Sequence, residues 1–446
     1  MILPESFIER TKVLLGEDGC EALTRALSKS PSISVRANNK ITLHPSNNLV
    51  PWCENGFYLQ DRPIFTLDPL LHGGAFYVQE ASSMFLHQVV KQHLLSAKRV
   101  LDLCAAPGGK STLLLQSLAE DCLLISNEII RSRANILSEN ITKWGNSNSI
   151  VTNNNPSDFG RLLPSYFDAV VVDAPCSGEG MFRKDLNAIN EWSPQAVDIC
   201  AKRQQEILSS VWETLKPGGV LVYSTCTFNK EENEENVEWI CSKLGATTLA
   251  VDLKGNSDIT LSDFGYRFYP HKTRGEGFFI SVLKKNKSDE VQENSLNFKK
   301  NVKQRELKDT HVSKMLKNSK EWAFFESSDK IKAYNRSFLN DCLFFEQQFN
   351  CLSSGIVMGE LKGKDFIPSQ QLALSKEIDL KKIEKIELDY KSAILYLKKE
   401  AIYLPDAKKG FLLVCYKNLP LGWVKNVGNR CNNLYPQAWR IRMNID

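Results

Sequence analysis

Between residues 98 and 283, short apolar runs alternate with amphipathic stretches, and this alternation constrains the fold more than any other feature of the sequence. The apolar runs have the length of buried strands: RVLDL, CLLIS, NSIV, FDAVVVD, GVLVYS and GFFISVL. The stretches between them, such as KSTLLLQSL and IIRSRANILSENITKW, have the pattern of helices. Strands that alternate with helices predict a parallel, doubly wound α/β sheet, which binds its ligand beyond the carboxyl ends of the strands.

The flanking sequence has a different pattern, and it divides the chain into four parts. Residues 1–95 combine two helical segments with short strand-like pieces and predict a small α+β domain. Residues 96–285 form the α/β domain. Residues 286–310 are polar without apolar periodicity and predict a linker. Residues 311–446 regain apolar segments such as FLLVCY and predict a separate C-terminal region.

The composition is that of a soluble globular protein, with 42% hydrophobic and 24% charged residues in a chain of 446. No window approaches the roughly 18 consecutive apolar residues of a membrane span, and the start, MILPESFIER, lacks the pattern of a secretory signal. The twelve cysteines include no Cys-x-x-Cys pair, so a structural zinc site has no support. We therefore expect a cytoplasmic protein with reduced cysteines, no metal and no membrane contact.

Positive charge is concentrated towards the C-terminus. The net charge is only +4, but residues 286–446 carry 28 Lys and Arg against 20 Asp and Glu. Such an excess favours a polyanionic partner. Near the end, basic side chains alternate with aromatic ones, which suits RNA contact, although the aromatics, Trp423 above all, equally suit the core of a small β domain. These residues are Lys417, Lys425, Arg430, Arg440 and Arg442 with Trp423, Tyr435 and Trp439.

The segment VLDLCAAPGGKST joins the predicted strand RVLDL to the helix that follows it, through a turn of small residues. Gly108 and Gly109 permit close approach to a ligand, and the amides at the helix start favour an anionic group. Leu103 stands where a phosphate loop has its upstream glycine, which disfavours an ATP site. Glu128, after the second strand, is placed to bind both hydroxyls of a ribose, or alternatively to complement a helix macrodipole. A glycine loop and an acid without a phosphate cradle favour S-adenosylmethionine.

Three motifs, CAAPGGKST, DAPCSGEG and YSTCT, resemble in order and spacing the Sun (Fmu) family of RNA cytosine-5 methyltransferases. HGGAFYVQEASSM and LGWVKNVGNRCNNLYPQAWRIR resemble the RsmF-type members, which act on small-subunit ribosomal RNA. The resemblance covers nearly the whole chain, more weakly in the linker and in residues 310–390. It implies a Rossmann-like S-adenosylmethionine-dependent methyltransferase domain between an N-terminal RNA-contacting domain and a C-terminal PUA-like RNA-binding module. It further implies an enzyme that forms 5-methylcytosine in ribosomal RNA, within or on its way into the small subunit. No residue fixes the oligomeric state, and we expect a monomer.

Cysteine chemistry explains why Cys176 and Cys226 each follow the end of a strand. A thiolate that adds to carbon 6 of cytosine converts carbon 5 into a nucleophile, which can then take a methyl group. A carboxyl group near N3 stabilises the adduct, a role that suits Asp173. Both thiols reach the same edge of a parallel sheet, so the residues alone do not say which one attacks.

The resemblance assigns the two thiols. In the family, the thiol of the Thr-Cys segment attacks and the thiol of the Pro-Cys segment assists product release, which makes Cys226 the nucleophile and Cys176 the release residue. The competing assignment makes Cys176 the nucleophile, as in DNA cytosine-5 enzymes, whose thiol follows a proline. Arg183 and Lys184, shortly after Cys176, are candidates to hold the RNA backbone, or belong to a charged surface loop.

The resemblance also implies the cofactor contacts. One of them, Asn155, stands where the family usually has an acid, so we expect weaker cofactor binding, with the nearby Asp158 as a possible substitute. Another, Arg133, matches a family position but also suits a solvated helix surface. The full set comprises Cys104, Ala105, Ala106, Pro107, Gly108, Gly109, Lys110, Glu128, Arg133, Asn155 and Asp173.

Two other functions compete with ribosomal RNA methylation. One is a ribosome-assembly protein whose methyltransferase fold binds RNA without catalysis; the presence of Cys176, Cys226, Asp173 and Lys110 disfavours it, and only Asn155 favours it. The other is the same chemistry on transfer RNA or DNA. No residue identifies the target nucleotide.

Overall fold

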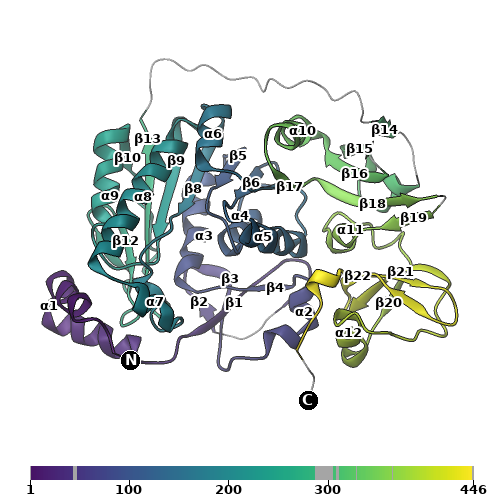
Figure 1. Cartoon of the computed structure of the whole chain (residues 1–446), viewed down its shortest axis with the longest axis horizontal. Coiled ribbons are helices and arrows are strands. Elements are labelled where there is room, and N and C mark those ends of the chain that lie inside the picture. The colour runs from purple at the N-terminus through teal and green to yellow at the C-terminus, as the bar shows by residue number, and fades with distance from the viewer. Residues whose placement is uncertain are drawn as a thin grey trace.

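The strands predicted between residues 98 and 283 belong to one ten-stranded sheet at the centre of the molecule (Figure 1). The structure is a computed structural model that describes residues 2–43, 48–286, 305–307, 311–327, 329–363 and 365–443. Most of the linker predicted at 286–310 lies outside the described residues. No helix within the described ranges is long and apolar enough to cross a membrane.

The central sheet has the strand order β11-β12-β13-β9-β8-β5-β6-β7-β17, with β10 beside β13. Its middle is parallel and its edges are antiparallel, so the prediction of a doubly wound, Rossmann-like α/β fold is confirmed. The parallel strands are β5 (Arg99–Asp102), β6 (Leu123–Asn127), β7 (Ser149–Thr152), β8 (Phe167–Asp173) and β9 (Leu215–Thr225). The antiparallel strands on the β9 side are β10 (Ala246–Thr248), β11 (Thr260–Ser262), β12 (Gly265–Phe268) and β13 (Phe278–Lys285).

Helices cover both faces of this sheet, which is why its strands are continuous apolar runs. One face packs against α3 (Leu86–Val89), α4 (Gly109–Ser117) and α5 (Arg131–Trp144). The other face packs against α6 (Pro156–Leu162), α8 (Pro194–Trp212), α9 (Glu234–Trp239) and α10 (Leu339–Gln348). Alternate residues of β8 point to opposite faces, so Val171 and Val172 belong to different core clusters.

The N-terminal part consists of a helix and a small sheet that packs below α4 and α5 (Figure 1). Helix α1 (Glu5–Leu27) bends at Gly16, whose φ of 74° interrupts the helical backbone, so the two predicted helical segments are the halves of one bent helix. The sheet has the order β2-β3-β1-β4. Its members are β1 (Ile33–Ala37), β2 (Leu49–Val50), β3 (Cys53–Leu59) and β4 (Phe76–Val78), with α2 (Pro69–His72) beside them.

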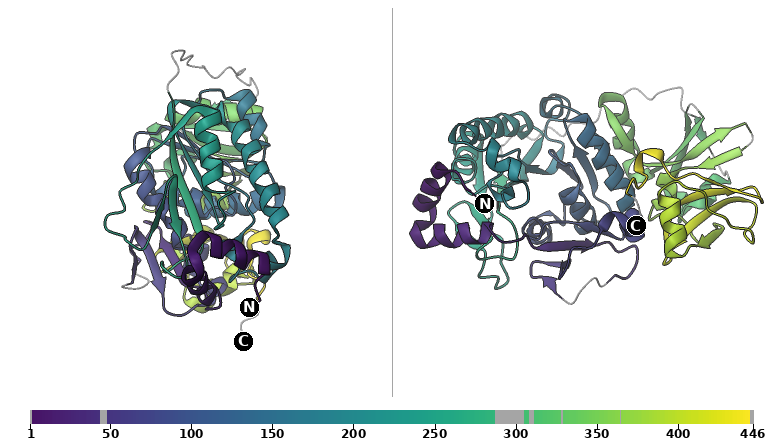
Figure 2. Two further views of the ribbon diagram at one scale, coloured as in Figure 1. Left: turned by 90° about the vertical axis from the view of Figure 1, so that its left-hand side faces the viewer. Right: turned by 60° about the horizontal axis from the view of Figure 1, so that its bottom comes forward.

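The C-terminal region holds two further sheets, on the side of the central sheet that faces away from α1 (Figure 2). The first contains β14 (Arg305–Leu307), β15 (Trp322–Ser327), β16 (Lys330–Asn335), β18 (Ile356–Lys362) and β19 (Asp365–Pro368). The second contains β20 (Lys385–Glu387), β21 (Gly410–Tyr416), β22 (Leu419–Asn426) and β23 (Cys431–Asn433). Helices α11 (Gln370–Leu374) and α12 (Tyr390–Leu397) pack with these sheets.

A segment of the C-terminal region is also part of the central sheet, which the division of the sequence did not anticipate. Strand β17 (Cys351–Ser354) pairs antiparallel with β7 and forms the edge of the sheet. Helix α10 packs on the same side, where buried Asp341 accepts a 2.8 Å hydrogen bond from Arg99 Nε at the start of β5. Asp341 also accepts a hydrogen bond from the Tyr166 hydroxyl. The boundary between the α/β domain and the C-terminal region, placed at residue 285 by the sequence, therefore does not separate their contacts.

We predict that Arg99→Met lowers the free energy of unfolding by roughly 1–3 kcal/mol, because it leaves the buried carboxylate of Asp341 with one donor fewer. Chemical denaturation measures this. The control is Lys98→Met, at the residue that precedes Arg99. It removes only an exposed ion pair with Asp121 and should lower the free energy of unfolding by less than about 1 kcal/mol. Equal losses in the two variants would show that α10 does not depend on this contact.

Candidate active site

The loop that follows β5 runs between the strand ends and the start of α4. Gly108 occupies the left-handed region with φ of 114° and is the N-cap residue of α4, a conformation that favours glycine. Gly109 lies beside β4, because a Cβ atom there would come within 3.5 Å of the Tyr77 ring. Buried Arg36 of β1 donates to the carbonyl of Gly109 at 3.3 Å. The N-terminal sheet therefore covers one side of the predicted cofactor loop.

Glu128 and Arg133 connect the second strand with this loop. Glu128 is 3% exposed, and its Oε1 accepts from the backbone amide of Ile130 at 2.9 Å, while its Oε2 lies 3.5 Å from Arg133 Nη1. Arg133 Nη2 donates to the carbonyl of Ala106 at 2.9 Å. Glu128 thus caps the start of α5, and Arg133 contacts both Glu128 and the loop instead of being only a solvated helix residue.

The two predicted thiols lie in contact. Cys176 Sγ is 3.1 Å from Cys226 Sγ, and the Cys226 amide donates to Cys176 Sγ at 3.3 Å. Asp173, at the end of β8, accepts from Ser224 Oγ at 2.8 Å and forms an ion pair of 2.7 Å with Lys110 Nζ. The four residues that the sequence singled out for chemistry therefore meet at one edge of the sheet.

Burial and neighbouring charge set the protonation of this site. The hydrogen bond with Cys226, together with burial, raises the pKa of the Cys176 thiol well above its usual value. Burial lowers the pKa of Lys110, but the Asp173 carboxylate outweighs this and raises it above its ordinary value. Burial and the nearby carboxylates of Asp173 and Glu128 raise the pKa of Asp102 to about 7.

The same groups fit S-adenosylmethionine, which carries a sulfonium and an ammonium group. Three acids, Asp102, Glu128 and Asp173, lie close enough for their charges to interact. Only two basic side chains pair with them in the described residues: Lys110 with Asp173 and Arg133 with Glu128. Asp102 is fully buried, and its Oδ1 has no hydrogen-bond partner among the residues that the structure describes. A group of acids beside a glycine loop suits a cationic cofactor better than a nucleoside triphosphate.

Three residues that the sequence proposed as ligand contacts, Asn155, Asp158 and Arg183, form no contact with the group of Lys110, Asp173, Cys176 and Cys226 within the part of the chain that the structure describes. Asn155 is exposed at the N-cap of α6, and among the described residues its side chain forms no hydrogen bond with the other site residues. Asp158 is held by Asn154 and Arg161 instead. Arg183 is buried against Glu276 at 2.5 Å and donates to the Gly275 carbonyl at 2.6 Å. The expectation that Arg183 holds RNA, or lies in a charged surface loop, was therefore wrong.

The aromatic residues that the sequence proposed for RNA contact are buried or half-buried in the structure. Trp423 and Tyr435 are 2% and 0% exposed and belong to core clusters of the C-terminal sheets. Trp439 is half-buried beneath Lys143 of α5. The view that Trp423 is a core residue is thus confirmed, and Tyr435 is also unavailable for base stacking.

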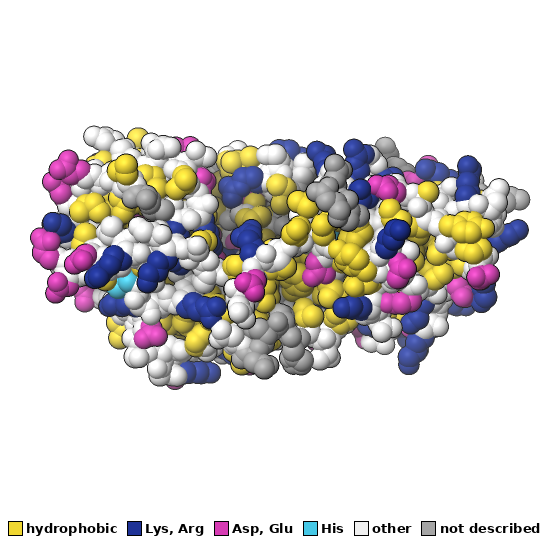
Figure 3. All heavy atoms as spheres, turned by 90° about the horizontal axis from the view of Figure 1, so that it is seen from below, with side chains coloured by type: hydrophobic (Ala, Val, Ile, Leu, Met, Phe, Trp, Pro, Cys, Tyr) yellow, Lys and Arg dark blue, Asp and Glu magenta, His cyan; other side chains and the backbone are white. Residues whose placement is uncertain are grey.

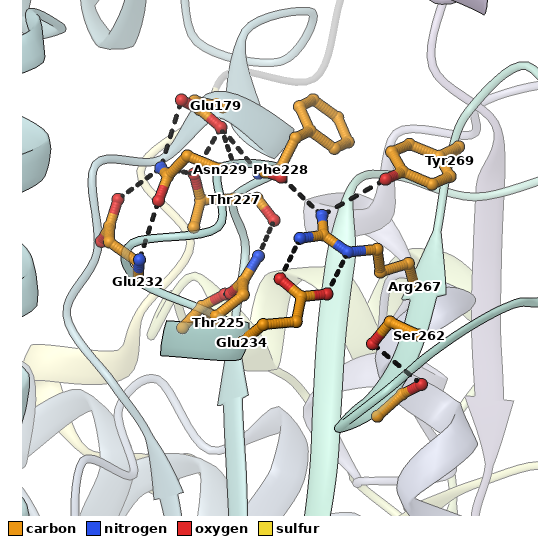
Figure 4. Close-up of polar contacts among 12 residues, drawn as sticks. Glu179, Thr225, Thr227, Phe228, Asn229, Glu232, Glu234, Ser262, Arg267 and Tyr269 are labelled. Carbon is orange, nitrogen blue, oxygen red and sulfur yellow. Dashed lines mark hydrogen bonds and ion pairs between the residues drawn. The ribbon is translucent and has the colours of Figure 1, made fainter. Parts of the chain in front are cut away.

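Two buried glutamates, which the sequence reading did not assign, join the loops of the two thiols (Figure 4). Glu179 Oε2, from the Cys176 loop, accepts from Thr227 Oγ1 and the Phe228 amide at 2.6 Å and from the Asn229 amide at 2.9 Å. Glu232, from the Cys226 loop, accepts in return from the amide of Ser177 at 3.0 Å. Each carboxylate thus belongs to one loop and binds the other, which fixes the distance between the thiols.

Close backbone packing completes this arrangement. The Gly180 amide donates to the Cys226 carbonyl at 2.8 Å, and a Cβ atom on Gly180 would come within 2.5 Å of the Gly277 carbonyl. Arg267 of β12 donates to the Phe228 carbonyl and to the Tyr269 hydroxyl and is paired with Glu234, as Figure 4 shows. The signal in the sequence was an acid at a short distance after each cysteine, in CSGEG and in TCTFNKEE.

The side of the molecule on which the parallel strands end is hollowed near its middle (Figure 3). Lys and Arg side chains border the hollow, and apolar side chains lie within it. A hollow with a basic border suits a polyanionic substrate.

The doubly wound sheet and the group of acids beside the glycine loop at its carboxyl edge define an S-adenosylmethionine-dependent methyltransferase. Three family models match consecutive parts of the chain: the N-terminal domain of 16S rRNA methyltransferase RsmF over residues 3–81, 16S rRNA methyltransferase RsmB/F over 92–284, and the methyltransferase RsmF PUA domain over 383–441. The chain belongs to the 16S rRNA methyltransferase RsmB/F family, with the N-terminal and PUA domains of its RsmF type. The expected family, enzyme class and cofactor are confirmed.

Known proteins agree with this membership. Ribosomal RNA small subunit methyltransferase F of Cronobacter sakazakii is 31% identical over 87% of this chain and 83% of its own length. The protein of the same name from Vibrio parahaemolyticus is 36% identical over 65% of this chain, an alignment that spans 64% of the relative. Among solved structures, a methyltransferase homologue from Pyrococcus horikoshii is 28% identical with a TM-score of 0.55, covering 63% of this chain and 95% of the other.

We predict that Glu179→Gln lowers the rate of methyl transfer at least tenfold. Both carboxylate oxygens accept hydrogen bonds, Oε2 from the Phe228 and Asn229 amides and Oε1 from Trp192 Nε1, so an amide would turn its NH2 group towards one of these donors. Single-turnover methyl transfer measures the rate, and calorimetry should show S-adenosylmethionine affinity within twofold of wild type. Glu54→Gln, which removes an exposed carboxylate paired with Lys91, is the matched control. A rate within twofold of wild type in a folded Glu179→Gln protein would exclude a positioning role.

Proposed function

We propose that this chain methylates carbon 5 of a cytosine in 16S ribosomal RNA, with Cys226 as the nucleophile, Cys176 as the release residue and Asp173 as the group that contacts the base. The observation that carries the proposal is the contact of two thiols at 3.1 Å beside an Asp–Lys pair at the carboxyl edge of the sheet. Family membership supports the RNA substrate, and the small ribosomal subunit is the particle into which that RNA is assembled.

Protonation supports Cys226 as the attacking thiol. Because the pKa of Cys176 is raised well above its usual value, Cys176 keeps its proton and stands as a donor beside Cys226. The Lys110 ammonium lies close enough to Cys226 for charge interaction. Because a thiol that holds its proton tightly is the poorer nucleophile, the raised pKa of Cys176 supports Cys226 as the attacking residue.

Asp173 is held for a role at the base. One of its oxygens accepts from Ser224 and the other is paired with Lys110. A nucleobase that enters beside Cys226 would present N3 to this carboxyl group, which can pass a proton from the Lys110 ammonium to N3 as negative charge develops on the ring. Lys110 keeps the charge at this position balanced before the base arrives.

Release requires the bond between Cys226 Sγ and carbon 6 to break after the carbon 5 proton has left. Cys176 Sγ lies next to that sulfur, so its thiol can donate its proton to the departing Cys226 sulfur and take up the carbon 5 proton in exchange. Bound S-adenosylmethionine would supply the electrophilic methyl group, held by the Cys104–Lys110 loop and the group of acids that includes Glu128. Each thiol therefore acts at a different stage.

We expect Cys226→Ala to abolish methylation and Cys176→Ala to stop after methyl transfer as a covalent protein–RNA complex. The reaction combines each variant with S-adenosylmethionine and either deproteinised 16S RNA or isolated small subunits. A denaturing gel detects a slow-migrating, protease-sensitive band. Cys241→Ala, which changes a half-buried cysteine elsewhere, should behave as wild type.

The gel has three informative results. A band only in Cys176→Ala supports the assignment, whereas a band only in Cys226→Ala reverses the two roles. The absence of any band, together with no methyl incorporation by wild type on either substrate, would contradict the proposed function and favour the RNA-binding protein without catalysis.

We further expect Asn155→Asp to strengthen S-adenosylmethionine binding roughly three- to tenfold, because a carboxylate accepts a stronger hydrogen bond from an adenine amine than an amide does. Aspartate is as good an N-cap as asparagine, so α6 should be unaffected. Calorimetry measures the affinity, and Asn335→Asp, at the N-cap of a helical turn in the C-terminal region, is the matched control. Unchanged affinity would show that Asn155 does not reach the cofactor.

A further inference from the structure

A cavity lies where the N-terminal sheet, the central domain and the C-terminal region meet. It is bordered by the turn after β1 (Asn39, Lys40), the end of α11 with the residues that follow it (373–376), and the β21–β22 hairpin (418–420). The ends of α5, α11 and β22 approach one another there (Figure 1). Its volume is about 240 Å³, whereas a water occupies roughly 30 Å³ of liquid, so the cavity can hold an anion with several waters.

The charged residues that line this cavity are all basic. Lys40, Lys317 and Lys376 line it, and the lining residues that the structure describes include no Asp or Glu. Lys40 donates to three carbonyl groups: Lys143 at 2.7 Å and Leu374 at 2.6 Å, near the C-terminal ends of α5 and α11, and Gly73 at 3.1 Å. Lys40 therefore joins the three parts of the chain without leaving a free donor, and burial and the nearby Lys376 lower its pKa well below its ordinary value.

Lys376 has no such partners. Its ammonium lies 5.8 Å from the centre of the Trp144 ring, and no ion pair or hydrogen bond of this ammonium is found within the described part of the chain. Lys317 Nζ donates to the backbone carbonyl of Lys376 at 2.6 Å, which brings the second ammonium to the same wall. Ser375, Asn39 and Asn418 add polar side chains to the lining. The cavity is thus provided with donors and lacks an acceptor of opposite charge.

Charges of both signs lie around the cavity. Glu377, outside the lining, is close enough to interact with Lys317 and Lys376. The fully buried Arg36 lies 4.5 Å from the centre of the Trp144 ring, and its hydrogen-bond partners are side-chain amides, a hydroxyl and carbonyls, not carboxylates. Burial lowers the pKa of Arg36 to about 10 and that of Lys376 to about 8. A bound anion would offset both the burial and the mutual repulsion of these cations.

We propose that this cavity binds a phosphate group, which the RNA backbone supplies, through Lys317 and Lys376. The assignment to RNA rests on the proposed function, whereas the chemistry of the site is that of any phosphate oxyanion. Because the cavity walls come from the N-terminal sheet and the C-terminal region, one phosphodiester there would hold both domains on the same RNA. Free inorganic phosphate is the alternative source.

The first experiment measures thermal unfolding of the full chain with inorganic phosphate against chloride at equal ionic strength. Phosphate should raise the Tm of wild type and should lose most of this effect in the double variant Lys317→Gln/Lys376→Gln. Lys382→Gln/Lys408→Gln removes two exposed lysines that have acidic partners in the same region, and it should keep the full effect. An equal effect of phosphate in all three proteins, or none in wild type, would overturn the site.

The second experiment measures binding of 16S RNA without S-adenosylmethionine at several salt concentrations. Loss of one phosphate contact should reduce the slope of log Kd against log salt by about 0.7–0.9 and weaken binding roughly three- to tenfold at low salt. A phosphate effect on Tm with an unchanged slope would overturn the assignment to RNA and identify free phosphate as the ligand. Both measurements are independent of methyl transfer, so an inactive wild type with these binding results would contradict the proposed function alone.

Discussion

The parallel register of β5, β8 and β9 is the constraint on which the site depends. Asp102 is opposite Val171, and Asp173 is opposite Ser224, so the residues after these strands leave the sheet at one level. Lys110, Asp173, Cys176 and Cys226 lie at or after the ends of three different strands, and they meet because those strands end together. A shift of one strand by a single residue would turn its side chains to the other face and separate the ion pair from the thiols.

The thiol pair also needs a rigid support, and buried carboxylates supply it. Glu179 and Glu232 are 2% and 0% exposed, which would be costly for lone charges, but each is surrounded by donors of the opposite loop. Burial still raises the pKa of Glu232, so the network carries some unfavourable free energy. The network fixes the positions of the two cysteine loops relative to each other, as the proposed roles of Cys176 and Cys226 require.

Much of the central domain was predictable because its strands are apolar runs bounded by helices with clear periodicity. The motifs likewise predicted that Asp173, Cys176 and Cys226 lie together, because each lies at or just after the end of a strand in a sheet whose geometry is general. Arg183 was misread because its buried partner Glu276 is distant in the sequence, and nothing local distinguishes a buried arginine from an exposed one. Glu179 and Glu232 were missed for the same reason: their donors belong to a loop about fifty residues away.

Strand β17 changes what counts as the catalytic unit. It covers the backbone of β7, which would otherwise be an open sheet edge, and α10 packs apolar side chains over the same end. A fragment that stopped at residue 285 would expose this edge as a template for pairing with other chains and for aggregation. The C-terminal region is therefore more than an RNA-binding domain attached to the methyltransferase domain. It acts also as an intramolecular cap on the enzyme's sheet, so loss or gain of the PUA module during evolution would have to leave residues 339–354 in place.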